Sequence, residues 1–140
     1  MERCLELAQV ARDQGNTPVG SLVLKENQII AEASEELPTS FDIAGHAEII
    51  ALRHACYALN SHDLSGCTLY TTAEPCLMCS YAIRETHILQ VVIGAPTPNI
   101  GGVSSIYPIL REATITSWSP PPIIIEGILL DKCLALHQEM

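Results

Sequence analysis

Apolar residues recur along this chain with two spacings, one typical of helices and one typical of strands. Positions three and four apart predict amphipathic helices, whereas alternating or short continuous apolar runs predict strands. The spacing predicts a helix over residues 2–14 that ends at Gly15, and two strands within 18–33 around a turn at Glu26 and Asn27. The further predicted elements are a helix over 44–59, a strand over 66–74, a helix over 75–86, strands over 88–95 and 121–127, and a helix over 128–140.

This order of strands and helices is typical of a layered α/β domain, in which helices cover a sheet. The length of 140 residues fits one compact domain with a sizeable core, so a single domain over 1–140 is expected. The segment between 96 and 122 shows no clear period and receives no assignment.

Composition and charge restrict the partners. Hydrophobic residues make up 48% and charged ones 16%, which predicts much buried surface and favours a homodimer. A net charge of −9, without a basic cluster, weighs against a nucleic-acid partner, because phosphate binding depends largely on Lys and Arg. We expect no membrane span and no signal peptide, hence a cytoplasmic location in which cysteines stay reduced.

Cys76 and Cys79 stand three residues apart in "EPCLMC", at the start of a predicted helix. Residues with this spacing share a helix face, and Pro75 is suited to a helix start, where a missing N–H does no harm. The positive end of the helix dipole stabilises thiolates, which are the metal-binding form. The pair alone is compatible with a redox pair, a metal site or chance.

A second segment, "GHAEIIAL", brings His46 and Glu48 to the start of another predicted helix. One imidazole and two thiolates make three protein ligands, the number that a catalytic zinc has when its fourth position is open to water. Zinc lowers the pKa of that water toward neutrality. Glu48 lies two residues from His46 and does not share its helix face, so we expect it beside the water as a proton shuttle.

The order H-x-E … P-C-x-x-C is the known signature of zinc-dependent base deaminases. The segments "TPVGSLVLKENQIIAEA", "HAEIIALRHA", "CTLYTTAEPCLMCSYAI", "VVIGA" and "EGILLDKC" resemble bacterial tRNA adenosine deaminases and guanine deaminases of the cytidine-deaminase-like superfamily. The resemblance implies a three-layer α/β/α fold with a central mixed five-stranded sheet, and a homodimer. It also implies Zn²⁺ held by His46, Cys76 and Cys79, Glu48 as the catalytic proton shuttle, and contacts from the backbone of Ala47 and Glu74 to the base.

Two departures from the tRNA enzymes bear on the substrate. Those relatives often continue into a basic tail, whereas this chain ends in "CLALHQEM", and Glu35 stands where they carry an Asn that contacts the base or ribose. An ionised Glu only accepts hydrogen bonds and repels a phosphate. We therefore expect a small, guanine-like base or nucleoside, with a tRNA adenosine deaminase or a catalytically inactive zinc-binding subunit as alternatives. Cys4, Cys56, Cys67 and Cys133 are predicted core thiols, and His54, His62, His87 and His137 are left outside the site.

Overall fold

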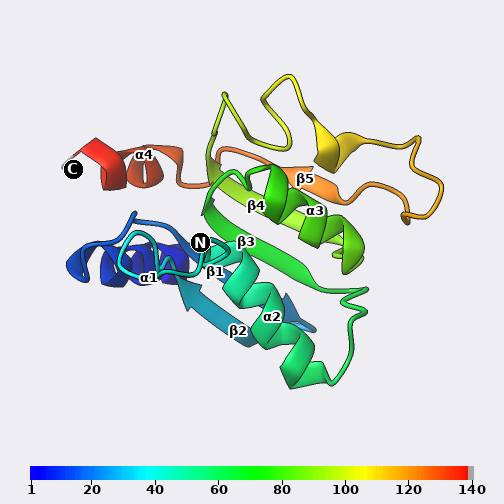
Figure 1. Ribbon diagram of the computed structural model, residues 1–140, viewed down its shortest axis with the longest axis horizontal. Coiled ribbons are helices and arrows are strands. Elements are labelled where there is room, and N and C mark those ends of the chain that lie inside the picture. Colours follow the sequence, from blue (N-terminus) through cyan, green and yellow to red (C-terminus); the bar gives the residue numbers. More distant parts are fainter. Residues whose placement is uncertain (139–140) are drawn as a thin grey trace.

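The computed structural model describes residues 1–138, and its elements follow the predicted order (Figure 1). The last two residues of the predicted final helix lie outside the described residues. The helices are α1 (Glu2–Asp13), α2 (Ala47–Leu59), α3 (Leu77–Glu85), the short 3-10 helix η1 (Ile109–Arg111) and α4 (Leu130–Gln138). The strands are β1 (Gly20–Lys25), β2 (Gln28–Ser34), β3 (Thr68–Ala73), β4 (Gln90–Ala95) and β5 (Ile123–Ile125).

The strands form one mixed sheet in the order β2-β1-β3-β4-β5. β1 is antiparallel to β2 and β3, whereas β4 is parallel to β3 and β5. The β1–β2 turn falls at Glu26 and Asn27, which have φ angles of 50° and 64°. Two successive positive φ angles are typical of the tight turns that match strand twist. The predicted mixed five-stranded sheet is confirmed.

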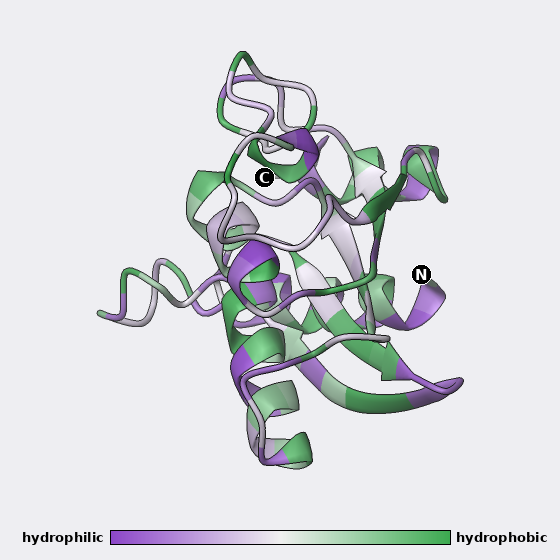
Figure 2. Cartoon of the chain, turned by 90° about the vertical axis from the view of Figure 1, so that its right-hand side faces the viewer, coloured by the Kyte–Doolittle hydropathy of each residue, from purple (hydrophilic) through white to green (hydrophobic). Residues whose placement is uncertain are grey.

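Helices cover both faces of the sheet, which gives three layers (Figure 1). Alternate strand residues such as Val23, Leu69 and Val91 belong to the main apolar core with α2 and α3. On the opposite face α1 and α4 approach closely at two glycines, because a Cβ at Gly20 or Gly94 would overlap α1 or α4. Figure 2 shows hydrophobic segments in the strands and mixed hydropathy along the helices. The period-2 strands and amphipathic helices therefore produce the layers directly.

Segment 96–122 contains little regular structure beyond η1, and a buried side chain of α3 holds much of it. The guanidinium of Arg84, a buried α3 residue, donates to the carbonyls of Ile109, Glu112 and Ser119. It also lies 4.5 Å from the ring centre of Trp118. A single buried cation thus organises a loop that has no hydrophobic period of its own.

The core cysteines agree with the prediction except at one position. Cys4, Cys67 and Cys133 are fully buried. Cys56 is half-buried and lines a cavity of about 370 Å³ near the end of α2. The prediction of a core thiol is therefore only partly right for Cys56. No helix within residues 1–138 has both the length and the apolar character that a membrane crossing requires.

Candidate metal centre and active site

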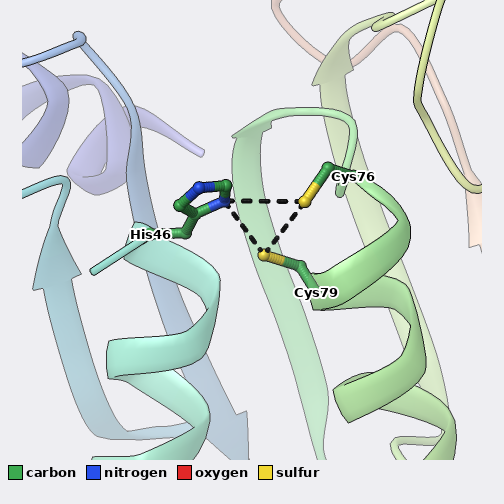
Figure 3. A group of neighbouring side chains, drawn as sticks. All are labelled: His46, Cys76 and Cys79. Atoms are coloured by element: carbon green, nitrogen blue, oxygen red, sulfur yellow. Dashed lines mark hydrogen bonds between the residues drawn. The ribbon is translucent and has the colours of Figure 1, made fainter. Parts of the chain in front are cut away.

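Two helix starts bring three metal-binding side chains together. His46 is the N-cap of α2 and Cys76 is the N-cap of α3, with Cys79 in the first turn of α3. The Nδ1 atom of His46 lies 3.5 Å from the Cys76 sulfur and 3.4 Å from the Cys79 sulfur. The two sulfurs are 3.7 Å apart. Figure 3 shows all three atoms directed toward one point between α2 and α3.

These separations fit a tetrahedral zinc ion. Bonds of about 2.3 Å to sulfur and about 2.0–2.1 Å to nitrogen place two sulfurs roughly 3.8 Å apart and a sulfur and a nitrogen roughly 3.5 Å apart. The three ligand atoms match those values without any movement of the chain. Within residues 1–138, no fourth His, Cys, Asp or Glu joins this group. Three protein ligands are typical of a catalytic zinc with one open position, whereas structural zinc normally has four.

The two thiols differ in acidity. A hydrogen bond from the Cys79 side chain lowers the pKa of Cys76 to about 5, and backbone N–H groups at the start of α3 act in the same direction. The same contact with Cys76, together with burial, raises the pKa of Cys79. The pair therefore favours one thiolate and one thiol until a cation compensates the second negative charge, so metal binding would release a proton.

Glu48 lies in the first turn of α2 and is only 4% exposed. Its Oε1 atom accepts hydrogen bonds from the hydroxyls of Ser21, at 3.3 Å, and Thr71, at 3.1 Å. Burial raises the pKa of Glu48, because an ionised carboxylate loses its hydration there. A carboxyl group of raised pKa beside a metal site is suited to accept and return protons.

A cavity of about 380 Å³ opens beside these residues, within the size range of small-ligand sites. Its wall includes the predicted site residues His46, Glu48, Glu74 and Cys76, and also Glu35. The remaining lining residues are Thr17, Val19, Leu37, Ala73, Thr97, Ile100 and His137.

Glu35 follows β2 directly and is 6% exposed. Its Oε1 atom accepts the backbone N–H of Ala47 at 2.9 Å, and within residues 1–138 no hydrogen bond joins its second oxygen to another group. Burial raises the pKa of Glu35 to about 7; the Ala47 N–H opposes this shift and nearby Glu48 adds to it. The Ala47 N–H, which the resemblance directs at the base, is thus already occupied, and an Ala47 contact with a base stays a prediction.

Glu74 has a role for its side chain that the sequence did not indicate. It is 3% exposed, and its Oε1 atom accepts the Thr97 N–H and the Ser104 hydroxyl, at 3.1 and 2.6 Å. Its Oε2 atom accepts the N–H groups of Val103 and Ser104, both at 2.9 Å. The four bonds fasten the 97–104 loop, which contributes Thr97 and Ile100 to the cavity, beside the segment that carries Cys76.

Two further cavity contributions were missed. His137, near the end of α4, lines the cavity, although its spacing in the sequence does not connect it to the site. Thr97 and Ile100 come from the loop that received no assignment. Their only sequence signal is "NIGG", in which Gly101 and Gly102 permit a close approach, because an added Cβ would overlap the side chains of Glu74 and Ser80.

The fold and this site define a zinc-binding deaminase domain. Residues 1–95 match the family described as the cytidine and deoxycytidylate deaminase zinc-binding region, and the chain belongs to that family. The matched stretch includes all three metal-binding side chains and Glu48.

Three relatives show to which kinds of deaminase the chain is similar. The chain is 41% identical over 131 residues to a tRNA-specific adenosine deaminase of Aquifex aeolicus, which covers 91% of this chain and 87% of that protein. A solved structure from a study of A-to-I editing by tRNA:A34 deaminases is similar with a TM-score of 0.89 and 29% identity, covering 97% of this chain and 96% of the other. A guanine deaminase from Nitrosomonas europaea is similar with a TM-score of 0.77 and 25% identity, covering 99% and 80%.

Proposed function

We propose that this chain deaminates adenosine in a tRNA to inosine. The observation that carries the proposal is similarity along nearly the whole length to a tRNA-specific adenosine deaminase. The similarities to guanine deaminases either are at lower identity or cover less of this chain. The stronger similarity to the tRNA enzyme revises the expectation that a small free base is the substrate. It favours a nucleic-acid partner despite the net charge of −9.

His46, Cys76 and Cys79 are the residues that would hold zinc. When bound, zinc supplies Lewis-acid activation of water at neutral pH. The reaction replaces the C6 amine of adenine with oxygen: water provides the oxygen, and ammonia leaves. Enzymes of this kind take the target base out of the stack, and the cavity of about 380 Å³ would receive it.

Glu48 would move the protons. Its carboxylate takes one proton from water and gives it to ring nitrogen N1. It then takes the second proton from the oxygen that is now bonded to C6 and gives that proton to the departing amine. Burial beside the ligands keeps the carboxylate close to both donor and acceptor. The presence of Glu48 in this position supports an enzyme over a catalytically inactive zinc-binding subunit.

A guanine-like base is the second candidate, and Glu35 is the observation that favours it. One oxygen of Glu35 is held by the Ala47 N–H, which leaves the other as an acceptor in the cavity wall. Guanine presents N–H and amino donors to such an acceptor. As a free base it carries no phosphate, so an acidic protein does not repel it.

Zinc-loaded protein incubated with a tRNA anticodon stem-loop, adenosine, guanine and cytidine separates the candidates. Inosine formation in the stem-loop, absent in Glu48→Gln, is the expected result. Ammonia release from guanine together with an unchanged stem-loop would overturn the tRNA proposal in favour of the second candidate.

A Glu35→Gln variant tests whether the Glu35 side chain in the cavity wall takes part in substrate recognition. Its single amide oxygen would be used by the Ala47 N–H, so the cavity would face an NH₂ donor where it had an acceptor. Above pH 7, where Glu35 is mostly ionised, a substrate that donates to Glu35 should lose about 10- to 100-fold in kcat/KM. Equal substrate profiles would remove Glu35 from substrate recognition.

We also propose a homodimer with a cytoplasmic location, where tRNA is available. Large apolar side chains at Phe41, Ile43 and Tyr57 are strongly exposed. We propose that these side chains contribute to the dimer interface.

A further inference from the structure

Two fully buried hydroxyls lie directly beneath the Glu48 carboxylate. Ser21 of β1 and Thr71 of β3 are opposite each other in the antiparallel register, and both are 0% exposed. Their oxygens are 2.9 Å apart, and each lies within hydrogen-bond distance of the same atom, Glu48 Oε1. The two strands thus present a pair of hydroxyls to the α2 residue that faces the cavity.

These hydroxyls interrupt a face of the sheet that is otherwise apolar. The neighbouring positions on this face, Val23 and Leu69, belong to the hydrophobic core. A buried hydroxyl is costly unless it is hydrogen-bonded, and core packing alone would be served as well by Ala or Val. The pair therefore requires an explanation beyond packing, and Glu48 is the charged group that both hydroxyls contact.

The two hydroxyl hydrogens of Ser21 and Thr71 have a choice of acceptors. Thr71 Oγ1 also lies 3.0 Å from the Ala73 carbonyl, and Ser21 can donate either to Thr71 or to Glu48. Each hydroxyl has one hydrogen, which rotates to suit its acceptors. Without moving a heavy atom, the pair can give Glu48 two hydrogen bonds, one or none. The pair can thus hold the Glu48 side chain in one position whichever hydroxyl donates to it.

We propose that Ser21 and Thr71 are positioning residues that hold the Glu48 carboxylate in line for proton transfer. The inference rests on the proposed role of Glu48 as proton shuttle, and it deepens that role by naming the groups that fix its geometry. Neither residue lines the cavity, so we expect their removal to act on the chemical step and not on binding.

Isosteric variants isolate the hydroxyls. Thr71→Val removes one hydroxyl at constant shape, Ser21→Ala removes the other, and Thr71→Ser keeps a hydroxyl while losing a methyl group. Thr72→Val is the matched control: Thr72 is also buried, but its hydroxyl accepts the Gly20 N–H and does not contact Glu48. The substrate is whichever one the wild-type protein deaminates.

We expect the Ser21→Ala/Thr71→Val double variant to lose about 10- to 100-fold in kcat, a part of the factor that general acid–base catalysis supplies. KM and zinc content should stay within about twofold. Thr71→Ser should keep most of the activity, and Thr72→Val should keep kcat even where its melting temperature falls. A Thr71→Val variant with wild-type kcat, or a Thr72→Val variant with an equal loss, would overturn the proposal.

Crystal structures of the zinc-loaded variants give a readout that does not depend on activity. A Glu48 carboxylate displaced or split between rotamers in Thr71→Val, and unchanged in Thr72→Val, supports the proposal. An unmoved Glu48 in Thr71→Val overturns it. Because this comparison needs no turnover, it separates failure of the positioning role from failure of the tRNA assignment, and the single variants carry the test if the double variant does not fold.

Discussion

Glu74→Gln replaces one oxygen of a buried carboxylate with an NH₂ group. Each oxygen of that carboxylate accepts two hydrogen bonds. The four hydrogen bonds that Glu74 accepts come from the 97–104 loop, so the substitution acts on the fastening of that loop. Shape and volume barely change, which leaves hydrogen bonding and charge as the altered quantities.

The better orientation of the glutamine follows from its partners. With its NH₂ placed at the Oε1 position, the Ser104 hydroxyl can turn and accept, while the oxygen keeps the Val103 and Ser104 N–H groups. The Thr97 N–H then has no acceptor, at a cost of about 1–3 kcal/mol. The retained bonds lose their charge assistance, roughly 1 kcal/mol each, and relief from burying a charge offsets part of this. A net loss of about 3 kcal/mol in the free energy of unfolding results, or roughly 10 °C in Tm for a domain of this size.

Thermal unfolding followed by circular dichroism measures the shift, and hydrogen exchange at the Val103 and Ser104 amides localises it. Glu26→Gln is the matched control, because Glu26 is exposed in the β1–β2 turn and its loss should cost no more than about 0.5 kcal/mol. A Glu74→Gln protein that melts within about 2 °C of wild type, with unchanged exchange in the loop, would refute the assignment of Glu74 as the loop's anchor.

Three other predictions concern the metal, the proton shuttle and assembly. Purified protein should contain about one zinc per chain by elemental analysis, and Cys76→Ser or Cys79→Ser should lose most of it; active protein without zinc would contradict the metal site. Glu48→Gln should keep zinc and fold while kcat falls by about 10²- to 10⁴-fold, and near-normal turnover would exclude Glu48 as the shuttle. Light scattering at micromolar concentration should give twice the mass of the 15.2 kDa chain, and a monomer would count against the homodimer.

Local patterns were sufficient for the regular elements and for the metal-binding residues. Each predicted helix and strand has its own hydrophobic period, and the turn at Glu26 and Asn27 is defined by adjacent residues. His46 and the two cysteines could be found because each lies at a helix start within a short motif. Their close approach confirms that two short motifs, thirty residues apart, meet at one point.

Contacts between distant segments were not predictable in the same way. The 97–104 loop is held by Glu74, and segment 109–119 is held by Arg84, so a single buried charged side chain in each case replaces the period that a helix or strand would show. His137 reaches the cavity because α4 packs against β4 and beside α1 (Figure 1). Nothing in the sequence distinguishes Ser21 and Thr71 from other strand residues. Only the strand register places them together beneath Glu48.

This division follows from what the two tasks of the site require. Metal binding and the proposed proton transfer need fixed geometry, and the site provides it with helix starts supported by strands, where short motifs are visible in the sequence. The other side of the cavity, where the proposed base would bind, is formed by Leu37, Thr97, Ile100 and His137 on loops and the last helix. Glu35 belongs to both parts, because it ends a strand and bonds the Ala47 N–H beside the ligand His46, yet also faces the cavity. If Glu35 contacts the substrate as proposed, its substitution should change which substrate is accepted, whereas substitution of Glu48 should act on the proposed proton transfer.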